Sequence, residues 1–202
     1  GIPNEITDQT SQQKSNQGLL KLSASYQPNG NNQLDYDVLS RVTKDSQVQN
    51  LLSSVVGNTN QFDETTPYSI NQNINYYYTL NEDNIFAFEA QHLYRDEDPF
   101  YNAILEDKAN YSGTANDLGL NGSQINYDLA QEKRVQSNQV DAKLDYWNIL
   151  NKKSNINLTL GTIASRQQFD SKIFQNLDDQ SVLDPAPTIA GGLSTNDISY
   201  NF

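Results

Sequence analysis

The sequence contains no cysteine and no methionine, and only one histidine and one tryptophan among its 202 residues. Without cysteine the chain can form no disulfide, no thiol nucleophile and no cysteine-based zinc or iron–sulfur site. No apolar run reaches the roughly 18 residues that a membrane-spanning helix needs. Basic residues are also scarce, at 13 against 25 acids, which gives a net charge of −12. This balance disfavours nucleic acid and anionic lipid headgroups as partners.

Apolar residues make up only 36% of the chain, and the mean hydropathy is −0.73. Twelve tyrosines and seven phenylalanines stand among many Asn, Gln, Ser and Thr residues. Such a composition suits a disordered chain, a polar β-solenoid, or a β-barrel that is wet inside and apolar outside. An aromatic content of 10% argues against disorder.

Strict alternation of apolar and polar residues recurs in six segments and predicts six β-strands. These strands are expected at about 18–26, 34–42, 68–80, 85–94, 138–147 and 155–165. Their lengths compare well with the roughly 9–11 residues that a tilted strand needs to cross the hydrocarbon layer of a membrane. A seventh strand is expected to begin at 197–202, where apolar and polar residues alternate again.

Each predicted strand has one apolar and one polar face. Charged residues such as Lys21, Asp37, Glu89 and Lys143 fall on the polar face. This pattern is what a strand between lipid and a wet lumen requires. The central residues of the apolar face are expected to face lipid, and they are Leu22, Val38, Ile74, Phe88, Leu144 and Leu158.

The connections between the predicted strands alternate in length. Short turns are expected at 27–33, at 81–84 and from 148 onward, and long connections at 43–67, 95–137 and 166–197. Tight periplasmic turns opposite long outer loops are typical of outer-membrane barrels. Aromatic residues beside the short turns are expected to form half of an aromatic girdle, and they are Tyr26, Tyr36, Tyr78, Phe86, Tyr146 and Trp147.

Two stretches within the long connections fit either a helix or an extended loop. Residues 46–57 place four apolar residues on one helical face and end on Gly57, a typical helix stop. Residues 98–107 open with Asp98 and Pro99, which are favoured at a helix start. Residues 125–139 are expected to extend the fifth strand outward.

Three segments together resemble the barrel of TonB-dependent outer-membrane receptors. They read SASYQPNGNNQLDYDVLSR (23–41), QNINYYYTLNEDNIFAFEAQHLYRDEDPFYNAIL (72–105) and KLDYWNILNKKSNINLTLGT (143–162), and the likeness covers about residues 18–177. The resemblance is closest to the Bacteroidetes-type receptors that carry an N-terminal carboxypeptidase-like regulatory domain. It rests on strands and turns and on no catalytic motif.

This resemblance implies an all-β fold, an antiparallel up-and-down meander that forms a section of a transmembrane β-barrel with 22 strands. Because the chain lacks methionine and contains too few strands to close, residues 1–202 are expected to be one partial barrel section. The implied location is the bacterial outer membrane, and the implied activity is energised import of a scarce ligand. The implied partners are outer-membrane lipid, the rest of the barrel and its plug, the TonB system through regions outside this chain, and a surface lipoprotein.

No Ser–His–Asp order, phosphate loop or dinucleotide fingerprint is present, so we expect no enzyme and no cofactor. His92 lies on the apolar face without a second histidine, and an interfacial residue is a better interpretation than a metal ligand. The acidic runs at 95–99 and 177–184 lack EF-hand spacing and are interpreted as solvated loop charges. Asp141, Lys143 and Asp145 are interpreted as neutralising one another along a wet wall. No metal site is therefore expected.

The ligand itself is not encoded in any motif. Loop aromatics bind sugars and peptides well, and five are candidates for ligand contact: Phe62, Tyr94, Phe100, Tyr101 and Tyr111. The alternative for the whole chain is a secreted all-β binding or adhesion module, in which the apolar strand faces would pack a sandwich core.

Overall fold

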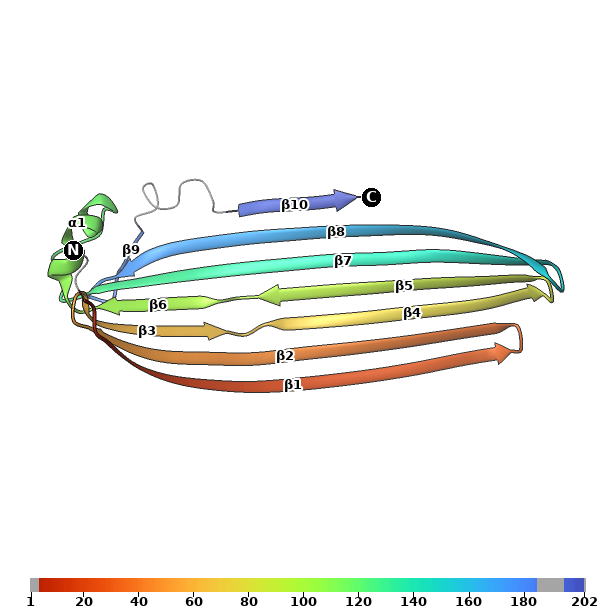
Figure 1. Ribbon diagram of the computed structural model, residues 1–202, viewed down its shortest axis with the longest axis horizontal. Helices are drawn as coiled ribbons and strands as arrows, with labels where there is room; N and C mark the ends of the chain where they lie inside the picture. The colour runs from red at the N-terminus through yellow and green to blue at the C-terminus, as the bar shows by residue number, and fades with distance from the viewer. Residues whose placement is uncertain (1–3, 185–194, 202) are drawn as a thin grey trace.

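The protein is seen here as a computed structural model that describes residues 4–184 and 195–201. One long, curved antiparallel sheet dominates it (Figure 1). The strands are β1 (Thr7–Asn29), β2 (Asn32–Ser53), β3 (Gly57–Thr65), β4 (Tyr68–Asn81), β5 (Asn84–Glu97), β6 (Phe100–Leu105), β7 (Tyr127–Asn151), β8 (Ser154–Asn176), β9 (Val182–Leu183) and β10 (Thr195–Asn201), with one helix, α1 (Lys108–Asp117). The predicted fold class, an all-β antiparallel meander, is confirmed.

Eight of the ten strands, β1 to β8, behave as a meander of six long ones. Strands β3 and β4 pair with β2 in one unbroken register and are separated only by residues 66–67. Strands β5 and β6 pair with β7 in the same way, around residues 98–99. The longest strand, β7, has 25 residues, which at about 3.3 Å per residue is about 80 Å. The sheet is therefore more than twice as long as a membrane crossing requires.

All six predicted strands exist in the predicted order, each paired with its sequence neighbour, and the predicted extension of the fifth strand over 125–139 is part of β7. The three long connections join strands at one end of the sheet, but most of their residues are not loop. Strands β3 and β6 and the outer halves of β2, β7 and β8 occupy them. The predicted lengths were too short because the outer halves carry polar residues on both faces, so the alternation used to find strands disappears there.

The two stretches that allowed a helix are both strands. Residues 46–53 continue β2, and residues 100–105 form β6. Gly57 does adopt a positive φ of 83°, as a helix stop would, but it serves the turn between β2 and β3. Neighbouring strands supply ladder partners for every backbone group in these stretches, which a lone short helix could not match.

The short turns form one end of the sheet, and each begins with an asparagine (Figure 1). The side-chain oxygens of Asn29, Asn81 and Asn151 accept a hydrogen bond from the backbone N–H two residues on, at 3.0, 3.1 and 2.9 Å. In the first two turns the same oxygen also accepts from the side-chain amide of Asn32 or Asn84, at 2.8 Å. This local bonding fixes where each hairpin reverses and therefore its register.

The far end of the sheet carries the helix. Tyr127, Ala115 and Leu120 are buried there in a small apolar cluster, and Tyr111 of α1 packs against it. No helix in the described part of the chain is long and apolar enough to cross a membrane. Strand β10 continues the sheet beyond β8, where the seventh strand was expected, while Phe202 lies outside the described residues.

Residue parity defines the two faces of the sheet. In every ladder from β1 to β8 the paired residues are both even or both odd, except for the pair that closes each hairpin turn. Side chains alternate along a strand, so even-numbered residues occupy one face and odd-numbered residues the other. We call these the even face and the odd face.

Substituting Gly57 by alanine should destabilise the protein by about 1–3 kcal/mol, because a side chain at positive φ is strained. The new Cβ would also lie 2.5 Å from the Asp107 Cβ. Gly30, in the first hairpin turn, has open space around it, and alanine there should change stability by less than about 1 kcal/mol. Chemical denaturation of both variants compares them. Equal effects would contradict the assigned turn geometry.

Candidate functional site

An uncharged apolar band covers the half of the even face nearest the short turns. From β1 to β8 it contains no Asp, Glu, Lys or Arg, while the next even positions outward include Lys44, Asp96 and Arg134. The six residues predicted to point the same way all lie in the band. Leu22, Leu144, Leu158 and Phe88 are exposed, by 57, 42, 53 and 38%, and Val38 and Ile74 are half-buried. Such a band of exposed apolar side chains requires a partner phase or surface.

Tyrosines mark both limits of this apolar band on β4. Tyr78 and Tyr68 are ten residues apart on the even face, about 33 Å along the strand. For strands tilted by 35–45°, as in membrane barrels, this corresponds to a height of about 25 Å, the usual height of their apolar band.

The predicted girdle residues next to the turns belong to the even face, with one exception. The rings of Tyr78, Phe86 and Tyr146 stack across β4, β5 and β7, with centroids 6.4 and 4.8 Å apart. Tyr26 and Tyr36 lie on the same face. Trp147 does not, because it follows Tyr146 directly and adjacent strand residues point to opposite faces.

A chain of hydrogen bonds crosses the apolar band. The Tyr36 hydroxyl donates to Gln72 Oε1 at 2.7 Å, which turns the amide N–H of Gln72 toward His92 Nδ1 at 3.0 Å. His92 Nε2 therefore carries the proton and donates it to Asn138 Oδ1 at 3.0 Å. His92 was expected to have no special role, but it is the centre of a chain that satisfies four polar side chains on an apolar surface. No pattern in the sequence indicates this chain of hydrogen bonds, because its members lie on four different strands.

The odd face at the same height is polar. Lys143 lies 3.1 Å from Glu89 and 3.5 Å from Asp145, while Asp141 accepts a hydrogen bond from Gln139 at 3.1 Å. Lys143 is therefore neutralised by Asp145, as predicted. Its second partner is Glu89, and not Asp141. Among the groups in the described ranges, no cluster of three or more His, Cys, Asp or Glu side chains is arranged to hold a metal ion.

A charged cluster lies directly beyond the apolar band on the even face. Arg134 donates to both carboxylate oxygens of Asp96, at 3.1 and 2.8 Å, and Gln136 donates to the same carboxylate at 2.8 Å. The hydrogen bond from Arg134 is the main reason why the pKa of Asp96 falls to about 2. The acidic run at 95–99 is thus bound within the sheet and is not a free loop cluster. Asp98 instead accepts the backbone N–H of Thr66 at 2.7 Å.

Two prolines interrupt the centre of the sheet just beyond this boundary. Pro67 and Pro99 have no N–H, so the ladder between the β3–β4 strand and the β5–β6 strand breaks between them. Each proline still accepts a hydrogen bond on its other side, from the backbone N–H of Thr43 or Lys133 at 3.0 Å.

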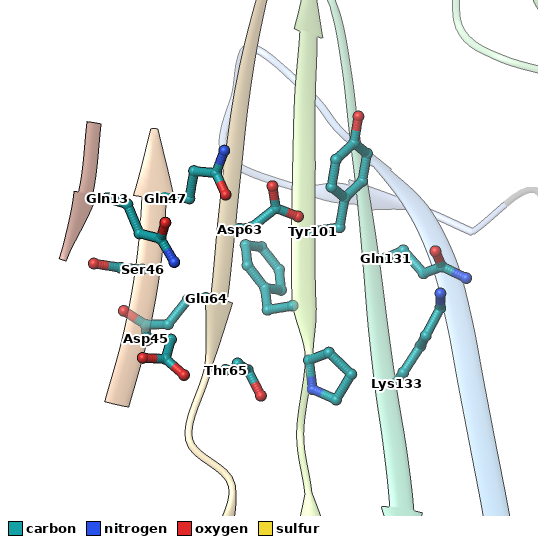
Figure 2. A pocket seen from close by; sticks show the side chains of 12 residues that line it. Gln13, Asp45, Ser46, Gln47, Asp63, Glu64, Thr65, Tyr101, Gln131 and Lys133 are labelled. Carbon is teal, nitrogen blue, oxygen red and sulfur yellow. The ribbon is translucent and has the colours of Figure 1, made fainter. Parts of the chain in front are cut away.

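A hollow of about 520 Å³ lies at this break on the odd face (Figure 2). Two neighbouring rows of residues, directly opposed from strand to strand, line it. One row runs Gln13, Gln47, Asp63, Tyr101 and Gln131, and the other runs Asp45, Thr65, Pro99 and Lys133. The second row has short side chains at its centre, which leaves the hollow open between its charged ends.

The electrostatics of the hollow are uneven. Asp45 and Asp63 lie toward β2 and β3, and Lys133 lies on β7 on the opposite side (Figure 2). Burial raises the pKa of the Asp63 carboxyl. Burial, and then the charge of Asp63, raises the pKa of the Tyr101 hydroxyl. The polar groups of the hollow are therefore partly desolvated, which strengthens their attraction to a ligand charge.

The five aromatic candidates for ligand contact do not form one site. Tyr101 lies in the hollow, and Phe100 borders it from the start of β6. Phe62 and Phe100 face each other on the even face, with centroids 6.2 Å apart. Tyr94 donates to Asp96 at 3.2 Å, and Tyr111 belongs to the helix. The charged residues of the hollow were missed, because Asp45 and Asp63 lie in the predicted connection at 43–67, and no pattern in the sequence pairs that connection with the predicted strand extension that contains Lys133.

Comparison with known proteins adds no assignment: no family model and no curated protein matches the chain.

Replacing Arg134 by glutamine should destabilise the protein at pH 7. The pKa of Asp96 is about 2 in the folded state against 3.8 ordinarily, so the pair stabilises fully above about pH 4 and is lost as the pH falls through about 2. The difference between the parent protein and Arg134→Gln should therefore shrink below pH 4 in denaturation experiments. Lys44→Gln removes the more exposed Lys44–Glu64 pair and should have the smaller effect. A pH-independent difference would contradict the role of Asp96.

Proposed function

We propose that this chain is part of the wall of an outer-membrane TonB-dependent transporter, with the even face toward lipid and the odd face toward the lumen. The observation that carries the proposal is the uncharged apolar band of the even face, which ends where charged residues such as Lys44, Asp96 and Arg134 appear on the same face. A charged side chain at the middle of a bilayer costs about 2–4 kcal/mol on a barrel strand, so a lipid-facing band excludes charge.

Three further observations support the proposal. The stacked Tyr78, Phe86 and Tyr146 rings lie beside the tight turns, where a periplasmic girdle belongs. The odd face at the same height is polar and charged, as a wet lumen allows. The free edge of β1 offers backbone groups over 23 residues, and such an edge in lipid needs a neighbouring strand from the rest of a barrel.

The secreted module predicts a different distribution of apolar residues. A sandwich core would bury an apolar face along the whole length of long strands, against a second sheet. Here the described residues form one sheet, and its outer half mixes charged and polar residues with apolar ones, such as Phe62 and Phe100 on the even face. The sheet therefore fits an apolar layer of limited depth better than a sandwich core.

Cysteine accessibility tests the proposal, and this chain contributes no cysteine of its own. Leu144→Cys in the full-length protein should stay unlabelled when whole cells are treated with a membrane-impermeant maleimide, because lipid covers that position. Gly113→Cys, on the exposed side of α1, should label readily. Equal labelling of the two positions would rule out a lipid-facing Leu144.

A further inference from the structure

The hollow at the proline break holds opposite charges that do not meet. Asp45 and Lys133 belong to the same row across the sheet but are separated by Thr65 and Pro99 on the two intervening strands. Three inter-strand spacings put their backbones about 14 Å apart. Two side chains of this length cannot close that gap and form a direct ion pair.

The charged groups of the hollow are also uncommitted within the sheet. Over the described ranges, the structure shows no hydrogen bond or ion pair for the side chains of Asp45, Asp63 or Lys133. By contrast, Asp35 and Asp37 on the same face each accept a hydrogen bond from a serine of the neighbouring strand. Partly buried charges without partners are favourable only if something else neutralises them.

We propose that this hollow binds a short peptide by its two ends, with the terminal ammonium at Asp45 and Asp63 and the terminal carboxylate at Lys133. An extended peptide spans about 3.3–3.6 Å per residue, so three or four residues bridge a gap of about 10–14 Å. The Tyr101 hydroxyl lies between the two ends, and the Gln47 and Gln131 amides lie beside Asp45 and Lys133. All three groups can bond the peptide backbone. Charge at both ends makes the site selective for a zwitterion of this length.

The position of the hollow agrees with a route for ligand entry. Asp45 follows Val42, an outermost residue of the apolar band, by three residues, or about 10 Å along β2. In the proposed transporter this is the lumenal side of the wall, just outside the outer leaflet. The entry route rests on the proposed function, whereas binding at the hollow does not.

Calorimetric titration of the full-length protein in detergent tests the inference without a membrane. Trialanine or tetra-alanine should bind, and N-acetylation or C-amidation should each weaken binding about tenfold, because each removes one charge-assisted contact. Asp45→Asn, Asp63→Asn and Lys133→Gln should each have an effect of similar size. Each change keeps the size of the side chain close to the original, so folding should be retained.

Matched controls lie on the opposite face at the same height. Lys44→Gln and Asp170→Asn carry the same kinds of change on the even face and should leave binding unaltered. Peptides that bind equally well with blocked ends, or not at all, would overturn the inference. So would a simple diamine that binds as tightly as the peptide, because it would make the acidic side alone the site. None of these results depends on how Leu144→Cys labels in cells.

Discussion

Outside the pairs that close the hairpin turns, paired residues in the ladders from β1 to β8 are both even or both odd, and this register decides which side chains share a face. Side chains alternate along a strand, and a slip of one residue would move every side chain of that strand to the other face. The asparagine-led turns at Asn29, Asn81 and Asn151 prevent such a slip by fixing where each hairpin reverses. Six strands thereby place most of the apolar residues of their turn-proximal half on one surface, even though the chain has too few of them to fill a core.

The sequence predicts the half of the sheet near the turns well, for a physical reason. Leu22, Ile74 and Leu158 belong to segments in which apolar and polar residues alternate, because in that half of the sheet the even face is apolar and the odd face is polar. Apart from the extension predicted at 125–139, the outer half was missed because residues such as Lys44 and Asp45 are polar on both faces and carry no period. Their strand structure comes from pairing with long neighbouring strands, a tertiary effect that outweighs local preference.

The candidate site was even harder to predict from the local sequence than the outer strands. Asp45 and Asp63 lie on neighbouring strands of one hairpin, whereas Lys133 lies far along the chain, and the three line one hollow only through the register of β2, β3, β6 and β7. Pro67 and Pro99 are visible in the sequence, but residues 98–107 fitted either a helix that begins at Pro99 or an extended loop. Their shared level in the sheet, which opens the hollow, follows from the pairing of β3 with β6 and of β4 with β5. The His92 chain is similar, because its four members come from four strands.

The proposal requires lipid around the apolar band of the even face and water around the outer half of the same face. A spin-label scan of β7 tests this requirement. Labels placed one at a time from 132 to 148, in the full-length protein inserted in outer-membrane lipid, report access of oxygen and of a water-soluble nickel chelate. If lipid covers the apolar band, oxygen access should be high and nickel access low at the even positions 140, 142, 144 and 146, with the reverse at 132 and 134. Equal nickel access at all even positions along β7 would contradict it.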